Sequence, residues 1–289
     1  MIKLPPHIKN ITIPVHILFL FAVTSMIAFQ DWIWLWAVFV GWVLFSGLGI
    51  SIGYHRILSH KALPISPITK KVLTVLGMFG CQGSSIFWVA MHRGYHHPHA
   101  DTAKDFHSPF HGKWSAYMGW MFKLGLTDVN LKYAIDLLKD PFQVFVHKHH
   151  YKIIWLTVIA VALIDIRLAL YGMIIPMTLA MHQENLVDLF GHTPSSGYRN
   201  FDTSDWSTNV PVLGFLCWGQ GWHNNHHAFP RSARFGVRWW ELDPGWFAVC
   251  ALRAAYVRAR AACVCARCVC VRALRVPLSL SSLLSLSLS

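Results

Sequence analysis

The sequence predicts an all-α integral-membrane protein whose four transmembrane helices form two hairpins. Three observations support this fold class. The 289 residues are 54% hydrophobic and only 13% charged, whereas soluble domains contain roughly 25% charged residues. Their mean hydropathy is +0.41. The long apolar stretches occur as two closely spaced pairs, and polar segments rich in histidine separate and follow these pairs.

The first predicted hairpin consists of residues 11–29 and 32–53. A transmembrane helix needs about 20 mostly apolar residues, and both stretches meet this requirement. Only Gln30 and Asp31 lie between them. Because so short a connection allows only a tight turn, we expect the two helices to run antiparallel.

A third apolar stretch, residues 68–90, is interrupted by polar side chains. It contains Lys70, Lys71 and Gln82 together with several Gly and Ser residues. We therefore expect an interfacial or partly buried helix here rather than a transmembrane span. The following residues, 91–150, are polar and contain several prolines, which predicts a long segment in water.

The second predicted hairpin consists of residues 153–164 and 168–187. Asp165 and Arg167 mark a polar break between the two stretches, which predicts a turn on the far side of the membrane. The first stretch is short for a span, so long flanking side chains would have to reach the interface. Together the two hairpins complete the predicted set of four transmembrane helices.

The predicted topology places all the long polar segments on one side of the membrane. The N-terminus, residues 54–150 and the residues after 188 share that side, and they contain most of the lysines and arginines. The positive-inside rule therefore makes it the cytosolic or equivalent side. The net charge of +12 suits an anionic membrane surface or an acidic partner. No basic helix or aromatic-basic pattern predicts nucleic-acid binding.

The tail, residues 251–289, differs in composition from residues 1–250. It alternates Ala with Arg, then Val with Cys, then Ser with Leu. Dinucleotide repeats in DNA encode such alternating dipeptides, so we interpret the tail as translated simple-repeat sequence without a function. Two alternatives are a palmitoylated anchor and a zinc knuckle, the latter formed by Cys263, Cys265, Cys268 and Cys270.

Nine histidines fall into four tight groups. The groups are His55 and His60; His92, His96 and His97; His192 after Gly191; and His223, His226 and His227. Imidazole is the commonest metal ligand that is neutral near pH 7, and one zinc ion needs only three or four protein ligands. Nine clustered histidines therefore suit two metal ions. Residues three and four apart share a helix face, so each group can serve one metal and turn a neighbour toward the second.

The spacing of these groups resembles the histidine boxes of integral-membrane fatty acid desaturases. The boxes read H-x4-H, H-x3-H-H and H-x2-H-H, in that order. The short sequence motifs around the boxes resemble those of the delta-9, acyl-CoA-desaturase-like branch, notably Gly53-Tyr54-His55-Arg56 and Gly221-Trp222-His223. The resemblance covers roughly residues 10–245. It implies a four-span protein with a cytosolic helical cap that holds two iron ions (Fe2+) and uses O2.

The resemblance also implies nine histidine ligands and one asparagine that acts through a water molecule. The eight box histidines match by position, and His192 matches the ninth. Asp188 stands four residues before His192, where the family pattern has asparagine. In a rival alignment Asn185 bridges the water and Asp188 is the ligand. The second box is also one residue longer than the form common in delta-9 enzymes, which leaves the double-bond position open.

Further residues are candidates for supporting roles. Asp101, Asp105 and Asp202 can accept hydrogen bonds from ligand imidazoles, which usually have such partners. Tryptophans near the boxes can line an acyl channel, although most tryptophans of a membrane protein lie at interfaces or in the core. The candidates are Trp88, Trp114, Trp120 and Trp222.

By this resemblance, the protein inserts a cis double bond into a saturated acyl chain carried by CoA or lipid, in a multi-pass membrane location. The membrane would be the endoplasmic reticulum, the plastid membrane or the bacterial inner membrane. Because no haem or flavin domain is visible, electrons must come from an external donor, cytochrome b5 or ferredoxin. The alternatives are an acyl hydroxylase or oxygenase on the same scaffold, a catalytically impaired homologue, and a membrane metal-binding protein.

Overall fold

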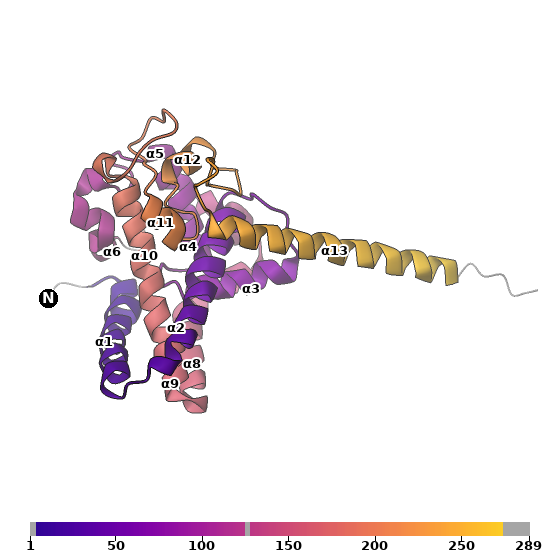
Figure 1. The fold of residues 1–289 in the computed structure, drawn as a ribbon, viewed down its shortest axis with the longest axis horizontal. Coiled ribbons are helices and arrows are strands. Elements are labelled where there is room, and N and C mark those ends of the chain that lie inside the picture. The colour runs from indigo at the N-terminus through magenta and orange to yellow at the C-terminus, as the bar shows by residue number, and fades with distance from the viewer. Residues whose placement is uncertain (1–3, 125–127, 274–289) are drawn as a thin grey trace, which may run out of the picture. The chain divides into compact units, whose positions relative to one another are not determined.

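The computed structural model describes residues 4–124 and 128–273, and it is mainly helical (Figure 1). The chain divides into two compact units, Met1–Val249 and Cys250–Ser289. Within the first unit, α1, α2, α8 and α10 run side by side, and α5, α11 and α12 gather at one end. Helix α13, Pro244–Ala273, contains the residues of the tail that the structure describes.

The first apolar pair folds as two long continuous helices. One consists of η1, Ile8–Thr12, and α1, Ile13–Ala28. The other consists of η2, Trp32–Trp34, α2, Leu35–Trp42, and η3, Val43–Ser59. Among the described residues, these two helices are the ones long and apolar enough to cross a membrane. The second helix extends past the predicted end at residue 53, and this extension contains His55.

The second apolar pair also folds as two helices, with a break at Asp165. The first is α8, Pro141–Ile164, which begins well before the predicted start at residue 153. The second consists of α9, Ile166–Ala169, η9, Leu170–Ile174, and α10, Ile175–Gly191. The Asp165 side chain accepts hydrogen bonds from the backbone of Arg167 and Leu168 and so begins the second helix.

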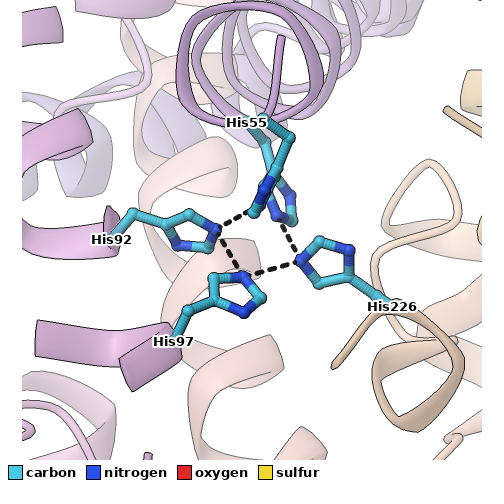
Figure 2. Close-up of side chains that lie close together, drawn as sticks. His55, His92, His97 and His226 are labelled. Carbon is cyan, nitrogen blue, oxygen red and sulfur yellow. Dashed lines mark hydrogen bonds between the residues drawn. The ribbon is translucent and has the colours of Figure 1, made fainter. Parts of the chain in front are cut away.

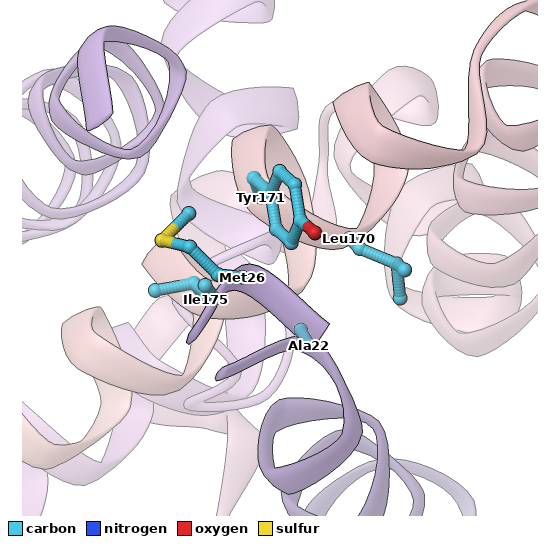
Figure 3. Close-up of a cluster of buried hydrophobic side chains, with 5 residues drawn as sticks. All are labelled: Ala22, Met26, Leu170, Tyr171 and Ile175. Atoms are coloured by element: carbon cyan, nitrogen blue, oxygen red, sulfur yellow. The ribbon is translucent and has the colours of Figure 1, made fainter. Parts of the chain in front are cut away.

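Contacts near the two turns bring the hairpins together at the same end. Asp31, in the first turn, is only 7% exposed. Its Oδ2 accepts a 2.9 Å hydrogen bond from the Tyr171 hydroxyl, and its Oδ1 lies 3.4 Å from the Arg167 guanidinium. Beside this polar contact lies an apolar cluster, shown in Figure 3, that comprises Ala22, Met26, Leu170, Tyr171 and Ile175.

The prediction of one helix over residues 68–90 is wrong, because the structure has two helices there. They are α3, Pro67–Met78, and α4, Ser85–Met91. Between them the backbone of Cys81 and Gly83 adopts positive φ angles of 57° and 91°, which cannot continue a right-handed helix. The Ser84 hydroxyl then accepts from the backbone of Phe87 and starts α4.

The remaining described residues form short helices and loops above the long helices. The short helices before α8 are η4 His92–His96, α5 His97–His99, η5 Pro109–His111, η6 Ser115–Gly119, α6 Trp120–Lys123, η8 Leu131–Ala134 and α7 Ile135–Leu138. Those after α10 are η10 Pro194–Ser196, α11 Pro211–Leu216 and α12 His223–Ala228.

A buried ion pair connects η3 to the residues before α13. Arg56 is completely buried, and its Nη2 donates to both carboxylate oxygens of Asp243, at 2.8 and 3.0 Å. The same guanidinium donates to the backbone carbonyls of Trp218 and Ala233. Because a buried arginine needs such partners, the end of η3 is held directly by the C-terminal part of this unit.

Candidate metal centre

Five of the nine histidines form one group, which we call the five-histidine group: His55, His60, His92, His97 and His226. One ring nitrogen from each lies within 4.8 Å of those of the others. The Nε2 atoms of His55 and His97 are 2.9 and 3.0 Å from Nε2 of His226. Figure 2 shows the imidazoles of His55, His92, His97 and His226 pointing toward a common centre.

The other four histidines form a second group, the four-histidine group: His96, His192, His223 and His227. Nε2 of His223 lies 2.9 Å from Nε2 of His192 and 3.1 Å from Nε2 of His227. Nε2 of His96 lies 3.4 Å from that of His192 and 3.2 Å from that of His227. The structure thus brings together all nine histidines named from the sequence, in sets of five and four.

The winding of the helices explains which histidines share a group. The backbone N–H of His60 bonds to the carbonyl of His55, and that of His97 bonds to the carbonyl of His92. These are i to i+5 bonds of the π-helical type. Residues five apart therefore share a face, so His92 is grouped with His97 rather than with His96. His55 and His60, also five residues apart, lie in one group for the same reason.

Three carboxylates hold the outer nitrogens of the four-histidine group. Nδ1 of His192 donates to Asp101 at 2.8 Å, and Nδ1 of His96 donates to Asp105 at 3.0 Å. Nδ1 of His227 donates to Asp205 at 2.7 Å. Asp202, which the sequence suggested for this role, is instead exposed and contacts no described histidine. Sequence reasoning missed Asp205, although it lies in the same loop.

These carboxylates determine which nitrogen faces the centre of the group. A neutral imidazole whose Nδ1–H points outward has a lone pair at Nε2. The inward Nε2 atoms of His96, His192 and His227 then present lone pairs to one another at hydrogen-bond distance, with no proton to share. These lone pairs repel one another, and a cation between them would be coordinated by all three. The donor set therefore fits a metal ion that prefers imidazole nitrogen.

Burial keeps most of these imidazoles neutral, as metal binding requires. It lowers the pKa of His60 to about 3 and that of His227 to about 4, and it lowers the pKa of His92 and His97 well below the usual value. His192 differs, because burial, the largest single effect, is outweighed by the hydrogen bond to Asp101 together with the charges of Asp101, Asp105 and Asp205, which raise its pKa. A bound cation would take the place of that proton.

Asp188 and Asn185 lie near the groups but belong to neither. Oδ1 of Asn185 accepts a 2.9 Å hydrogen bond from Gln82. Oδ1 of Asp188 lies 3.9 Å from Nδ1 of His107. His107, which sequence reasoning did not single out, forms a third cluster of potential ligands with His96 and Asp105. Its place two residues after Asp105 is the only sequence signal that marked it.

Two adjoining cavities lead to the five-histidine group. The inner one is lined by Trp88, Met91, His92, Glu184 and Asp188, among others. The outer one is lined by residues from the N-terminal segment and α8, including Pro5, Pro6, His7, His150 and Tyr151. Both cavities share Gln82, Phe87 and Trp120, so they adjoin each other, and the inner one reaches His92.

Only two of the four tryptophans suggested for a channel line these cavities, namely Trp88 and Trp120. Trp114 is 62% exposed. Trp222 is buried, and its Nε1 donates to the carbonyl of Leu242. The expectation that Trp114 and Trp222 line the same channel is therefore wrong, because one faces outward and the other packs in the C-terminal loops.

Comparison with known proteins agrees with this arrangement. Residues 31–260 match the family model of fatty acid desaturases. The chain is 34% identical over 215 residues to the sn-1 stearoyl-lipid 9-desaturase of Anabaena variabilis, covering 74% of this chain and 78% of that protein. It is 30% identical over 245 residues to the sn-2 palmitoyl-lipid 9-desaturase of Nostoc sp., covering 81% and 85%. It is 31% identical over 245 residues to the acyl-CoA C20 Delta5-desaturase of Anemone leveillei, covering 81% and 74%.

The helical fold, the histidine groups and these matches define the class of protein as a lipid-metabolising oxidoreductase. The chain belongs to the fatty acid desaturase family. Within that family it falls in the delta-9-like branch. The recognition of this family from the three histidine boxes is thereby confirmed.

Proposed function

We propose that the protein is an oxygen-dependent acyl desaturase that inserts a cis double bond, of delta-9 type, with a histidine-ligated di-iron centre. The observation that carries this proposal is the convergence of nine Nε2 atoms into sets of five and four. One iron would bind the five-histidine group and the other the four-histidine group. Two bound iron ions would supply the oxygen-activating chemistry that unactivated methylenes require.

The balanced reaction removes two hydrogens from adjacent methylenes. One O2, two external electrons and two protons are consumed, and two waters form with the double bond. The protein's own task is to position the acyl chain and exclude water. The two adjoining cavities, of about 30 Å³ each, are too small to hold the chain as they stand, and they mark where it would approach His92 beside Trp88 and Met91. Asp188 lies in the same wall and would hold a water near the four-histidine group.

The membrane topology proposed here has four spans in two hairpins with the histidine groups on the cytosolic or equivalent side. The two long apolar helices support it, and so do the contacts that Asp31 makes with Tyr171 and Arg167 beside the second turn. The membrane would be that of a bacterium, a plastid or the endoplasmic reticulum. Residues 251–289 take no part in the reaction under this proposal.

Electrons would come from a separate acidic protein such as cytochrome b5 or ferredoxin. An open hollow leads from the surface to the five-histidine group, and it is lined by Ser59, His60, Lys61, Arg93, His97, Pro230 and Arg231. Asp136 pairs with both Lys61 and Arg93 at 2.9 and 2.7 Å. The three basic side chains with this one acid leave the rim positively charged, which complements an acidic donor.

Expression in a desaturase-deficient host followed by fatty-acid profiling tests the proposal. We expect an oxygen-dependent cis monoene, and we expect the purified chain to contain about two irons. A His92→Ala variant is the matched negative control. A hydroxylated chain as the main product would support the hydroxylase alternative. Much less than two irons with no product would support an impaired homologue, and bound metal without a product would support a metal-binding protein.

A further inference from the structure

Gln220 is the one residue that hydrogen-bonds to a histidine of each group in the part of the chain that the structure describes. Its side-chain Oε1 lies 2.8 Å from Nδ1 of His55 in the five-histidine group. Its backbone carbonyl lies 3.3 Å from Nδ1 of His223 in the four-histidine group. Gln220 is only 2% exposed, so water cannot replace either contact.

His55 depends on this contact more than its neighbours do. Among the described members of the five-histidine group, only His55 has an Nδ1 that bonds to another side chain. The Nδ1 of His226 is buried without a partner. The four-histidine group, by contrast, has three carboxylates for its outer nitrogens. His55 is therefore the only described imidazole in its group whose outer nitrogen, Nδ1, is held by another side chain.

A glutamine is an ambiguous partner for an imidazole. Its carbonyl oxygen accepts from Nδ1–H and leaves the Nε2 lone pair free for a metal. Its NH2 group, after a half-turn of the amide, would donate to Nδ1 and move the proton to Nε2. The second arrangement cannot bind a metal through Nε2. The amide of Gln220 must therefore be fixed from its other end.

Glu184 fixes that end. Its Oε1 accepts a 2.7 Å hydrogen bond from Nε2 of Gln220, and the residue is 5% exposed. A carboxyl group offers an acceptor oxygen in either ionisation state. A flipped amide would point its oxygen at Oε1 of Glu184 and break the hydrogen bond that this oxygen now accepts from the Gln220 NH2 group. Glu184 also lines the inner cavity near His92, where neither metal group uses it as a ligand.

We infer that Glu184 is a positioning residue that acts through Gln220 to hold His55 as a metal ligand. This inference rests on the proposed metal-dependent function. The relay runs from the Glu184 carboxyl to the Gln220 amide and then to Nδ1 of His55. It gives the five-histidine group what Asp101, Asp105 and Asp205 give the other group. Since partners of ligand histidines contribute about 10- to 100-fold to metal affinity, its loss has a measurable effect.

The test compares iron retention in four variants of the whole chain with that of the wild type. Glu184→Leu removes the acceptor, and Glu184→Gln keeps an acceptor oxygen of the same size. Gln220→Glu places two carboxyl groups side by side. The double variant E184Q/Q220E restores the relay in reverse order, because the new amide can donate to the new carboxylate, which accepts from His55. Iron per chain and iron loss to increasing chelator are measured on each purified protein.

We expect Glu184→Leu to lose one of its two irons at a chelator concentration about 10- to 100-fold lower than the wild type. Glu184→Gln should fall between Glu184→Leu and wild type, because its amide can accept from Gln220 or donate to a flipped Gln220 amide. Gln220→Glu should be weakened, and the double variant should recover most of the loss. A role in folding alone would not produce this recovery. Thermal unfolding of each metal-free variant checks that the fold is intact.

Two results would overturn the inference. One is wild-type iron retention in Glu184→Leu. The other is equal loss in Glu184→Leu and Glu184→Gln without recovery in the double variant, which would mean that the carboxylate charge matters and not the hydrogen-bond relay. A wild-type protein that binds no iron at all would instead contradict the proposed function, so the two failures are distinguishable.

Discussion

At the scale of single residues, the sequence predicted the histidines of both groups. It predicted only some of the carboxylates that hydrogen-bond to them. The box spacing named eight histidines, and the resemblance to the desaturase motif, with Asp188 four residues before His192, named the ninth. Asp101 and Asp105 were also foreseen. Asp205 was not, because its Oδ1 first binds Ser207 and Thr203 within its own loop and leaves Oδ2 for His227. That pairing depends on a loop conformation that spacing does not reveal.

The choice between His192 and Asp188 as a ligand has a direct test. His192 lies within the four-histidine group, whereas Asp188 lies outside it. We expect His192→Ala to reduce iron from about two toward one per chain, because it leaves three histidines. Asp188→Asn should keep about two irons and change mainly turnover. Metal analysis of both purified variants decides the matter, and the reverse pattern would favour the rival alignment.

The low pKa of buried histidines predicts acid sensitivity of the metal-free protein. His227 has a pKa of about 4 in the folded state and roughly 6.5 when unfolded. Between these values the unfolded chain binds a proton that the folded chain does not, so stability falls as pH falls through this window. The contribution is on the order of 3 kcal/mol. Thermal unfolding in detergent from pH 8 to 4 should show this loss, and His227→Gln should flatten it.

At the scale of elements, the apolar pairs predicted the long helices but not their winding. Hydropathy places a helix over residues 32–53, yet the π-type turns of η3, which begin at Val43, bring His55 and His60 together. Composition likewise suggested one helix over residues 68–90. The backbone at Cys81, with a positive φ, breaks it. Both features arise from tertiary packing of the metal-binding segments, which overrides local preference.

Close packing of α3 on η3 depends on small residues. A Cβ atom on Gly49 would lie 2.6 Å from the backbone carbon of Leu76, whereas the nearest atom to one on Gly172 would be the flexible end of the Leu168 side chain, at 3.0 Å. Backbone cannot move aside as a side chain can. We expect Gly49→Ala to cost about 1–3 kcal/mol and Gly172→Ala to be close to neutral. Thermal unfolding in detergent measures both, and equal effects would contradict this account.

At the scale of the whole molecule, sequence reasoning placed all four histidine groups on one side of the membrane through the two hairpins. It could not show that residues 193–243 fold back to complete both groups. That closure depends on contacts between residues far apart in the chain, such as His55 with His226. Nor could it show the basic hollow, whose rim combines residues from three separate segments.

The hollow predicts how charge affects the supply of electrons. Arg231 on its rim has no ion-pair partner in the described structure. We expect Arg231→Glu to raise the KM for an acidic donor protein several-fold and to weaken the salt dependence of turnover. Turnover with a small chemical reductant should not change. Lys104→Glu, at an exposed position outside the hollow, is the control, and an equal effect there would argue against specific docking.

The buried pair of Arg56 and Asp243 has a consequence for the order of events during biosynthesis. The two residues are 187 positions apart, and the last histidines of both groups precede Asp243 by fewer than twenty positions. While the ribosome is making the intervening chain, Arg56 has no carboxylate partner and neither group is complete. Full sets of iron ligands exist only after His226 and His227 have been made. Nascent chains that stall earlier should therefore remain metal-poor and open to quality control.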